Sequence, residues 1–195
     1  MNLPNKLTVL RIILMPVMVL TFYLGWYLIS AGVFLLAAFT DMLDGKYARK
    51  HGLVTVFGKF VDPLADKLIN LAALVILVWR ISQSQAQWYG IFVTLVAVVI
   101  ISREIIITSL RALAANEGVV IAADKMGKIK TVLQDIAIVG MFMDEATLIK
   151  NTFVGEIVHW LTVVLVFGAL VLTVASGIHY FTDNKELMKK IGKDI

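Results

Sequence analysis

Apolar residues fill this chain in long runs that short polar segments interrupt. Residues 12–40 contain no charged side chain. This run is too short for two membrane spans, because each span needs about 20 residues and a turn must join them. We therefore predict that the first span begins near Leu7 and that the second continues to about Arg49. Gly25 and residues 30–32 are predicted to mark the turn between them.

The apolar runs that follow predict four more spans, with polar segments between them. They are expected at about Gly58–Ile81, Trp88–Ala115, residues 127–143 and Phe153–Phe181. Each run is long enough to cross most or all of the hydrocarbon core as a helix. The pattern predicts an all-α integral membrane protein with six transmembrane helices, which form a single domain over residues 1–195.

The composition supports this prediction. The chain is 59% hydrophobic and 16% charged, whereas about 25% of the residues of a soluble domain are charged. Its mean hydropathy is +0.87. The chain has no cysteine, which excludes disulfide bonds and thiol chemistry.

Basic residues are distributed unequally between the two predicted sides of the membrane. One side receives the N-terminus, the connection after the second span, the connection between the fourth and fifth spans, and the C-terminal tail, all of which carry lysine or arginine. The other side has few basic residues, Arg80 and Lys150, with Asp144 and Glu145 close in sequence. The positive-inside rule therefore predicts a multi-pass protein of the cell membrane with both termini in the cytoplasm.

Four carboxylates stand close together at the cytoplasmic ends of the second and third predicted spans. Asp41, Asp44, Gly45 and Ala48 share an arc of about 100° on one helix, and Gly58, Asp62 and Asp66 share an arc of about 80° on the next. Two helices that a short turn connects can face each other, so we expect both pairs to converge. Small residues on the same faces, Gly45 in the first helix and Gly58 in the second, leave room for a ligand to approach the backbone.

Four converging carboxylates need cations between them at neutral pH. Oxygen-only ligands favour a hard divalent ion, Mg²⁺ or Mn²⁺, with Ca²⁺ also possible. Two such ions would suit phosphoryl transfer. The structural alternative is that each aspartate reaches the membrane interface or forms a salt bridge with Lys46, Arg49 or Lys67.

A second, basic group lies at the same predicted side of the membrane. Arg103 and Arg111 are within about 80° of each other on the fourth span, and Lys128 and Lys130 open the fifth. Guanidinium groups bind phosphate in a forked geometry, so this group predicts a site for a phosphorylated substrate or an anionic headgroup. The alternative is a basic cluster that only touches anionic lipid. Glu104 is expected to orient one of the arginines.

The acidic stretch has a recognisable spacing. It reads D-x-x-D-G-x-x-A-R, then eight residues, then G-x-x-x-D-x-x-x-D, over residues 41–66. It resembles the signature of the CDP-alcohol phosphotransferase family at every fixed position. Residues 2–11, 58–67, 102–111 and 127–131 are similar to a bacterial branch of that family. Members of this branch transfer a phosphatidyl group from CDP-diacylglycerol to sn-glycerol 3-phosphate and release CMP.

The resemblance implies a six-helix fold, usually as a homodimer, with the active site at the cytoplasmic interface and two divalent ions. Asp41, Asp44 and Asp62 would be metal ligands, and Asp66, also near the metal pair, would be the general base. The positions implied for the CDP-diacylglycerol site are Thr8, Asp41, Gly45, Ala48, Arg49 and Gly58. The positions implied for the acceptor phosphate are Arg103, Arg111, Lys128 and Lys130.

Other functions remain open at this point. A sibling transferase would use phosphatidylglycerol, inositol phosphate or another alcohol as its acceptor. A cation transporter could also use four carboxylates, but transporters place such sites near the midplane, at broken helices in paired halves. This chain shows no internal repeat and no glycine-rich nucleotide-binding motif. No nucleic-acid partner is expected.

Overall fold

The structure, a computed structural model, describes residues 3–51, 56–83, 87–116, 125–146 and 152–185. Within these ranges it describes the backbone but not the side chains at residues 3–5, 41–51, 56–63, 66, 116 and 125. The described residues form six helices and no strand, which confirms the all-α prediction. The helices are α1 (Leu3–Tyr23), α2 (Tyr27–His51), α3 (Val56–Ser82), α4 (Gln87–Asn116), α5 (Lys125–Asp144) and α6 (Phe153–Asp183).

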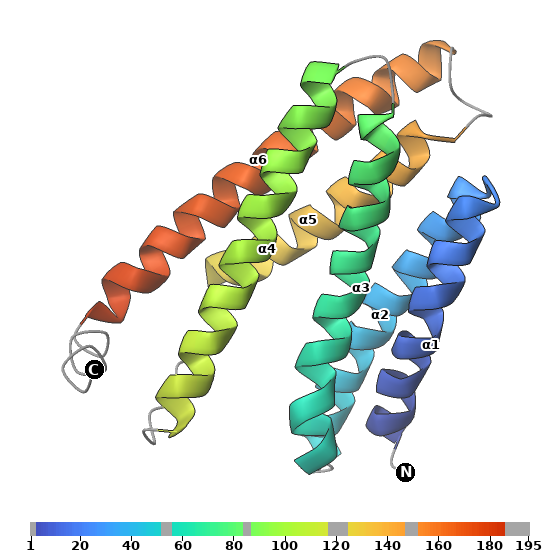
Figure 1. The fold of residues 1–195 in the computed structure, drawn as a ribbon. Coiled ribbons are helices and arrows are strands. Elements are labelled where there is room, and N and C mark those ends of the chain that lie inside the picture. Colours follow the sequence, from blue (N-terminus) through green and yellow to red (C-terminus); the bar gives the residue numbers. More distant parts are fainter. Residues whose placement is uncertain (1–2, 52–55, 84–86, 117–124, 147–151, 186–195) are drawn as a thin grey trace.

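Successive helices run in alternating directions, so the start of α1 and the end of α6 lie at the same end of the bundle (Figure 1). One group consists of α1 packed against both α2 and α3. In the other, α6 packs against both α4 and α5, and contacts of α3 with α4 and of α2 with α5 join the two groups. This topology brings the end of α2, the start of α3, the end of α4 and the start of α5 to the end of the bundle where α1 begins.

The turn between α1 and α2 is tighter than the sequence predicts. Gly25 has a φ of 79°, a conformation that glycine adopts without steric cost. The backbone N–H of Gly25 donates to Phe22 O at 2.9 Å, and that of Trp26 donates to Thr21 O at 2.9 Å. This is the Schellman pattern that ends helices. The prediction that residues 30–32 also belong to this turn is wrong, because α2 begins at Tyr27.

Many large apolar side chains point away from the bundle. Leu20 is 61% exposed, Leu95 60% and Val164 65%, which is a favourable arrangement only where the surrounding solvent is apolar. Three helical segments among the described residues are long and apolar enough to cross a membrane, namely Lys6–Tyr23, Gln87–Ala115 and Phe153–Asp183. Together, these observations indicate a membrane protein.

All four tryptophans lie at the end of the bundle remote from the acidic motif, and all are exposed. Trp26 is in the turn between α1 and α2, Trp79 is near the end of α3, Trp88 begins α4, and Trp160 lies two turns into α6. Tryptophan is enriched where hydrocarbon meets the headgroups. This ring of indoles is therefore placed to contact one membrane–water interface.

Two ion pairs connect the helix ends near these tryptophans. Arg80 Nε lies 3.0 Å from Glu145 Oε2 and joins α3 to the end of α5. His159 Nδ1 lies 2.8 Å from Asp144 Oδ2 and joins α5 to α6. The adjacent residues Asp144 and Glu145 thus fix the end of α5 against two different helices.

The close contact between α5 and α6 makes a prediction about stability. A Cβ added at Gly140 would lie 2.7 Å from Thr162 Oγ1, and Thr162 is buried. We expect Gly140→Ala to destabilise the protein by about 1–3 kcal/mol through overpacking, measured as a lower thermal midpoint in detergent. Gly32→Ala is the matched control, because no atom lies within 4 Å of its added Cβ.

A second substitution should restore the stability of the Gly140→Ala variant. Combining it with Thr162→Ala should recover most of the lost stability, because that change removes the obstructing hydroxyl. An equal loss for Gly140→Ala and Gly32→Ala would show that the α5–α6 contact is not tight.

Candidate active site

Both halves of the acidic motif, residues 41–51 and 56–66, are helical. Asp41 and Asp44 lie in the second half of α2, and Asp62 and Asp66 lie in the first half of α3. The two helices pack against each other and are joined by the short connection 52–55. The side chains of these four aspartates, and of Gly45, Ala48, Arg49 and Gly58, lie outside the described residues. Their convergence on one point therefore stays a prediction.

Thr8 from α1 reaches the same end of the bundle. It is fully buried, and Arg11, almost one turn further along the helix, is 1% exposed. A buried hydroxyl and a buried guanidinium are unusual in an apolar bundle, and here both lie on the helix that packs against α2 and α3. Thr8 therefore lies at the same end of the bundle as the acidic motif, and its contact with CDP stays a prediction.

The basic group is centred on Arg103 in α4. Its Nη2 donates to Ser176 Oγ of α6 at 3.1 Å, and its Nη1 donates to Glu104 Oε1 at 3.5 Å. Glycines border the same side chain. A Cβ at Gly127 would lie 3.8 Å from Arg103 Nη2, and one at Gly177 would lie 3.7 Å from its Cγ. Three helices thus form the slot that holds this guanidinium.

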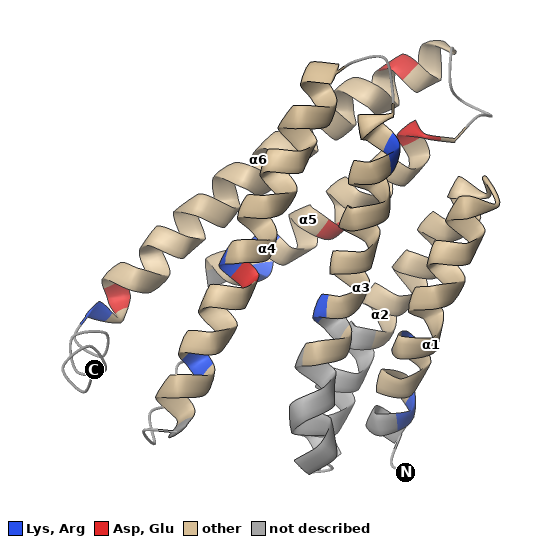
Figure 2. Ribbon diagram, in the orientation of Figure 1, with Lys and Arg blue, Asp and Glu red and all other residues tan. Residues whose placement is uncertain are grey.

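Glu104 balances two cations. Its Oε1 accepts a hydrogen bond from Arg103 Nη1, as expected from the sequence. It accepts another from Lys130 Nζ, which the sequence did not predict. Lys130 is 0% exposed, and a buried ammonium needs a partner of opposite charge. Figure 2 shows the acidic and basic residues together where α4 crosses α5.

Arg111 lies further along the same helix, with its Cζ 5.6 Å from the centre of the Tyr180 ring in α6. Arg103 and Arg111 are close enough to repel each other electrostatically. Three polar atoms here are buried without a hydrogen-bond partner in the described part of the chain: Arg103 Nε, Arg111 Nε and the Tyr180 hydroxyl oxygen. Two like charges with unused donors make a favourable site for an anion.

The structure separates the four predicted acceptor residues by environment. Arg103 and Arg111 each have a buried Nε without a hydrogen-bond partner among the described residues. Lys130 is buried against Glu104, and Lys128 is exposed on α5. The sequence did not single out either of the α6 residues that contact these arginines, Ser176 and Tyr180. Both occur within an apolar span, and their spacing of one helical turn on α6 was the only sign that they share a face.

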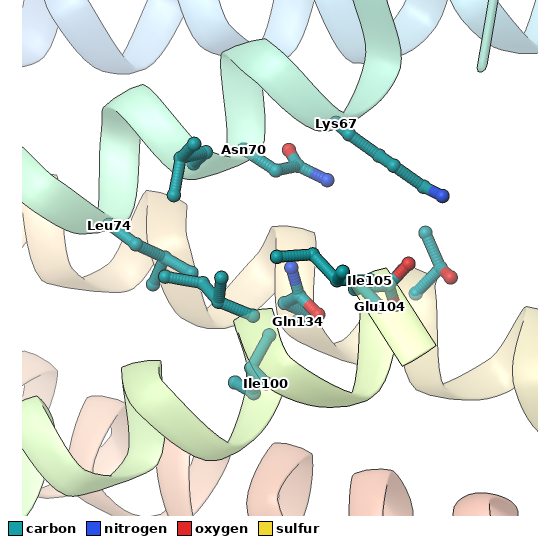
Figure 3. Close-up of a pocket in the computed structure, with 10 residues that line it drawn as sticks. Lys67, Asn70, Leu74, Ile100, Glu104, Ile105 and Gln134 are labelled. Atoms are coloured by element: carbon teal, nitrogen blue, oxygen red, sulfur yellow. The ribbon is translucent and has the colours of Figure 1, made fainter. Parts of the chain in front are cut away.

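A cavity of about 90 Å³ lies between α3, α4 and α5, beside the Glu104–Lys130 pair (Figure 3). The polar residues that line it are Lys67, Asn70, Glu104, Thr131 and Gln134. The apolar residues that line it are Leu71, Leu74, Ile100, Ile101 and Ile105. The cavity therefore combines hydrogen-bonding groups with an apolar wall.

Among the side chains that the structure describes, no group of three or more histidines and carboxylates is placed to hold a metal ion. The four motif aspartates are not among these side chains. Their chemistry fits Mg²⁺ and Mn²⁺, since these ions prefer carboxylate oxygen. The continuous helices through both halves of the motif place each pair of aspartates within about one turn.

Residues 1–174 match the family model described as CDP-alcohol phosphatidyltransferase. The chain belongs to this family. It is 38% identical to the CDP-diacylglycerol–glycerol-3-phosphate 3-phosphatidyltransferase of Bacillus subtilis, over 96% of this chain and 97% of that protein. The protein of the same name from Haemophilus influenzae is 38% identical over 92% of this chain and 91% of its own length. That from Rickettsia felis is 34% identical over 92% and 93%, respectively.

Proposed function

We propose that this protein transfers the phosphatidyl group of CDP-diacylglycerol to sn-glycerol 3-phosphate, giving phosphatidylglycerophosphate and CMP. Family membership supports the donor, and the names of the relatives support the acceptor. The observation on this chain that carries the acceptor is the pair of neighbouring arginines with unused buried donors, Arg103 and Arg111. These donors suit the phosphate of a small phosphorylated alcohol.

The proposed site lies in the cytoplasm-facing end of a six-span bundle that has both termini in the cytoplasm and forms a homodimer. The acyl chains of the donor stay in the bilayer while its nucleotide enters the cleft. The positions that would bind CDP-diacylglycerol are Thr8, Asp41, Gly45, Ala48, Arg49 and Gly58. The burial of Thr8 at this end of α1 supports its part in that site.

Asp41, Asp44, Asp62 and Asp66 would hold two divalent ions, Mg²⁺ or Mn²⁺. Bound there, the ions would neutralise charge on the phosphoryl oxygens and on the leaving CMP. The protein's own part in the reaction is to position the acceptor and to move one proton. Arg103 and Arg111 would fix the acceptor by its phosphate, with Lys128 and Lys130 adding positive charge, and would present its far primary hydroxyl.

Asp66 takes the proton of that hydroxyl as its oxygen attacks the phosphorus that carries the diacylglycerol. A new P–O bond forms to the acceptor, and the pyrophosphate P–O bond breaks. The electron pair of that bond leaves with CMP. The proton held by Asp66 then passes to solvent, which restores the carboxylate for the next turnover.

The acceptor site predicts a selective effect of Arg111→Gln. Loss of one charge-assisted contact to the phosphate should raise the KM for glycerol 3-phosphate about tenfold or more and change the KM for CDP-diacylglycerol by less than about twofold. Arg80→Gln is the matched control, because Arg80 lies at the opposite end of the bundle. Equal changes in both KM values for Arg111→Gln would indicate that the basic cluster only contacts anionic lipid.

An acceptor panel tests the proposed function against its alternatives. Purified protein in detergent is given CDP-diacylglycerol, Mg²⁺ or Mn²⁺, and glycerol 3-phosphate, inositol phosphate or phosphatidylglycerol in separate reactions. We expect rapid CMP release in the reaction with glycerol 3-phosphate and not in the reactions with the other two acceptors. Release with another alcohol would transfer the assignment to a sibling reaction, and cation flux without CMP release would indicate a transporter.

A further inference from the structure

We propose that Glu104 is a positioning residue, which fixes the distance between the arginines that would hold the acceptor phosphate and the helix turn that carries the proposed base. This distance would set how many carbon atoms the acceptor has between its phosphate and its attacking hydroxyl. The inference rests on the proposed function. It goes further by assigning the preferred acceptor length to a residue that acts through its neighbours.

Glu104 is the point at which cations from three helices meet. Its Oε1 accepts hydrogen bonds from Lys130 Nζ on α5 and from Arg103 Nη1 on its own helix, α4. Lys67 on α3 is close enough to attract Glu104 electrostatically, and both side chains line the cavity between α3, α4 and α5 (Figure 3). One carboxylate therefore connects all three helices by charge.

The contact with Lys130 gives this carboxylate a fixed place. Lys130 is 0% exposed. Separation of the pair would leave a buried ammonium without a counter-charge, which is strongly unfavourable. The carboxylate of Glu104 is therefore held where α4 meets α5.

On the side of the phosphate site, Glu104 orients Arg103. The guanidinium donates from Nη1 to Glu104 Oε1 at 3.5 Å and from Nη2 to Ser176 Oγ of α6 at 3.1 Å. Two acceptors on different helices fix the plane of the fork, because the guanidinium is rigid and planar. Without the carboxylate, Ser176 alone would hold this plane among the described residues.

On the side of the proposed base, Glu104 acts on α3 through Lys67. Lys67 directly follows Asp66, and both belong to the continuous helix α3. This helix packs against both α4 and α5. An attraction between Glu104 and Lys67 therefore holds the turn that carries Asp66 at a set distance from α4.

A set distance between phosphate site and base suits one acceptor length. Glycerol 3-phosphate has three carbon atoms between its phosphate oxygen and its far primary hydroxyl. An acceptor with two carbon atoms, held by its phosphate, would present its hydroxyl short of the reacting position. Misplacement by about 1 Å can lower a rate about 10²-fold, so the wild-type protein should discriminate strongly between the two lengths.

The test compares 3-hydroxypropyl phosphate with 2-hydroxyethyl phosphate, which differ by one methylene. Both kcat and KM are measured for wild type and for the double variant Glu104→Gln, Lys130→Gln, which removes both charges of the buried pair and should therefore keep the fold. We expect its kcat with the three-carbon acceptor to fall about tenfold and the KM to change less than about threefold. Its preference for three carbon atoms, as a ratio of kcat/KM values, should fall about fivefold or more.

Lys67→Gln provides an independent variant, because it leaves the pair of Glu104 and Lys130 intact. It should lower the same preference, whether or not the double variant folds. The matched control is the double variant Arg80→Gln, Glu145→Gln, which removes an ion pair between α3 and the end of α5 at the opposite end of the bundle. This control should keep the wild-type kcat and the wild-type preference.

Several outcomes would overturn the inference. A wild-type length preference in Lys67→Gln, or in the folded double variant at Glu104 and Lys130, would show that Glu104 only neutralises Lys130. A raised KM with an unchanged kcat would indicate direct contact with the phosphate. Failure of wild type to use glycerol 3-phosphate would instead remove the proposed acceptor. The same comparison, with the alcohol that is used and its homologue one methylene shorter, would then decide the role of Glu104 separately.

Discussion

Asp66→Asn is expected to lower kcat by about 10²–10⁴-fold, the usual contribution of a positioned general base. Asparagine has nearly the same shape as aspartate but cannot take the proton of the attacking hydroxyl. The variant should still fold and bind CDP-diacylglycerol, because residue 66 lies inside the continuous helix α3, which ends only at Ser82. The measurement is CMP release under saturating substrates, together with equilibrium binding of the lipid donor.

Asp183→Asn serves as the matched control. This aspartate pairs with His179 one turn earlier on α6, and its side chain is 56% exposed, so the same chemical change should leave kcat unaltered. An Asp66→Asn protein that turns over like wild type would remove Asp66 from the role of base.

Removal of divalent metal is expected to abolish turnover, and added Mg²⁺ or Mn²⁺ should restore it. The reason is electrostatic, because at the proposed site four converging aspartates without cations would repel both one another and the pyrophosphate of the donor. Asp44→Asn should raise the metal concentration required for half-maximal rate at least tenfold. Rates are measured across a metal titration after dialysis against a chelator.

Glu156→Gln provides the comparison for that titration, since this exposed carboxylate lies at the opposite end of the bundle in the first turn of α6. Its metal dependence should equal that of wild type. Full activity of the dialysed wild-type protein without added metal, with no metal detected in it, would contradict the assignment of the four aspartates.

The helices could be predicted closely because the membrane fixes their length. The uncharged run of residues 12–40 forced the second helix to continue through the acidic motif, and α2 does end at His51. The turn was predicted less well. Gly25 was identified correctly, but residues 30–32 lie inside α2, because small residues serve equally in turns and in close helix contacts.

For the site, the sequence could predict which residues share one face of a helix, but not which helices are neighbours. Spacing placed Arg103 and Arg111 on one face of α4, and the Nε of each is buried without a hydrogen-bond partner among the described residues. Charge alone could not distinguish Lys130, which is buried against Glu104, from Lys128, which is exposed. That distinction depends on which helices are neighbours.

Ser176 and Gln134 show the same limit for residues that the sequence did not assign to any site. Each is an uncharged residue within an apolar helix, and sequence patterns treat such a residue as packing. Only the contact of α6 with α4 gives Ser176 its partner Arg103. Likewise, only the packing of α3, α4 and α5 shows that Gln134 lines the cavity between them.

The most direct test of the central claim is the stoichiometry of turnover. Purified protein is incubated with CDP-diacylglycerol, glycerol 3-phosphate labelled in its glycerol, and Mg²⁺ or Mn²⁺, and both products are counted. Coupled transfer predicts one labelled lipid for each CMP released, with neither product in the presence of a chelator. Release of CMP without label in lipid, or no release with any alcohol from folded protein that has bound metal, would contradict it.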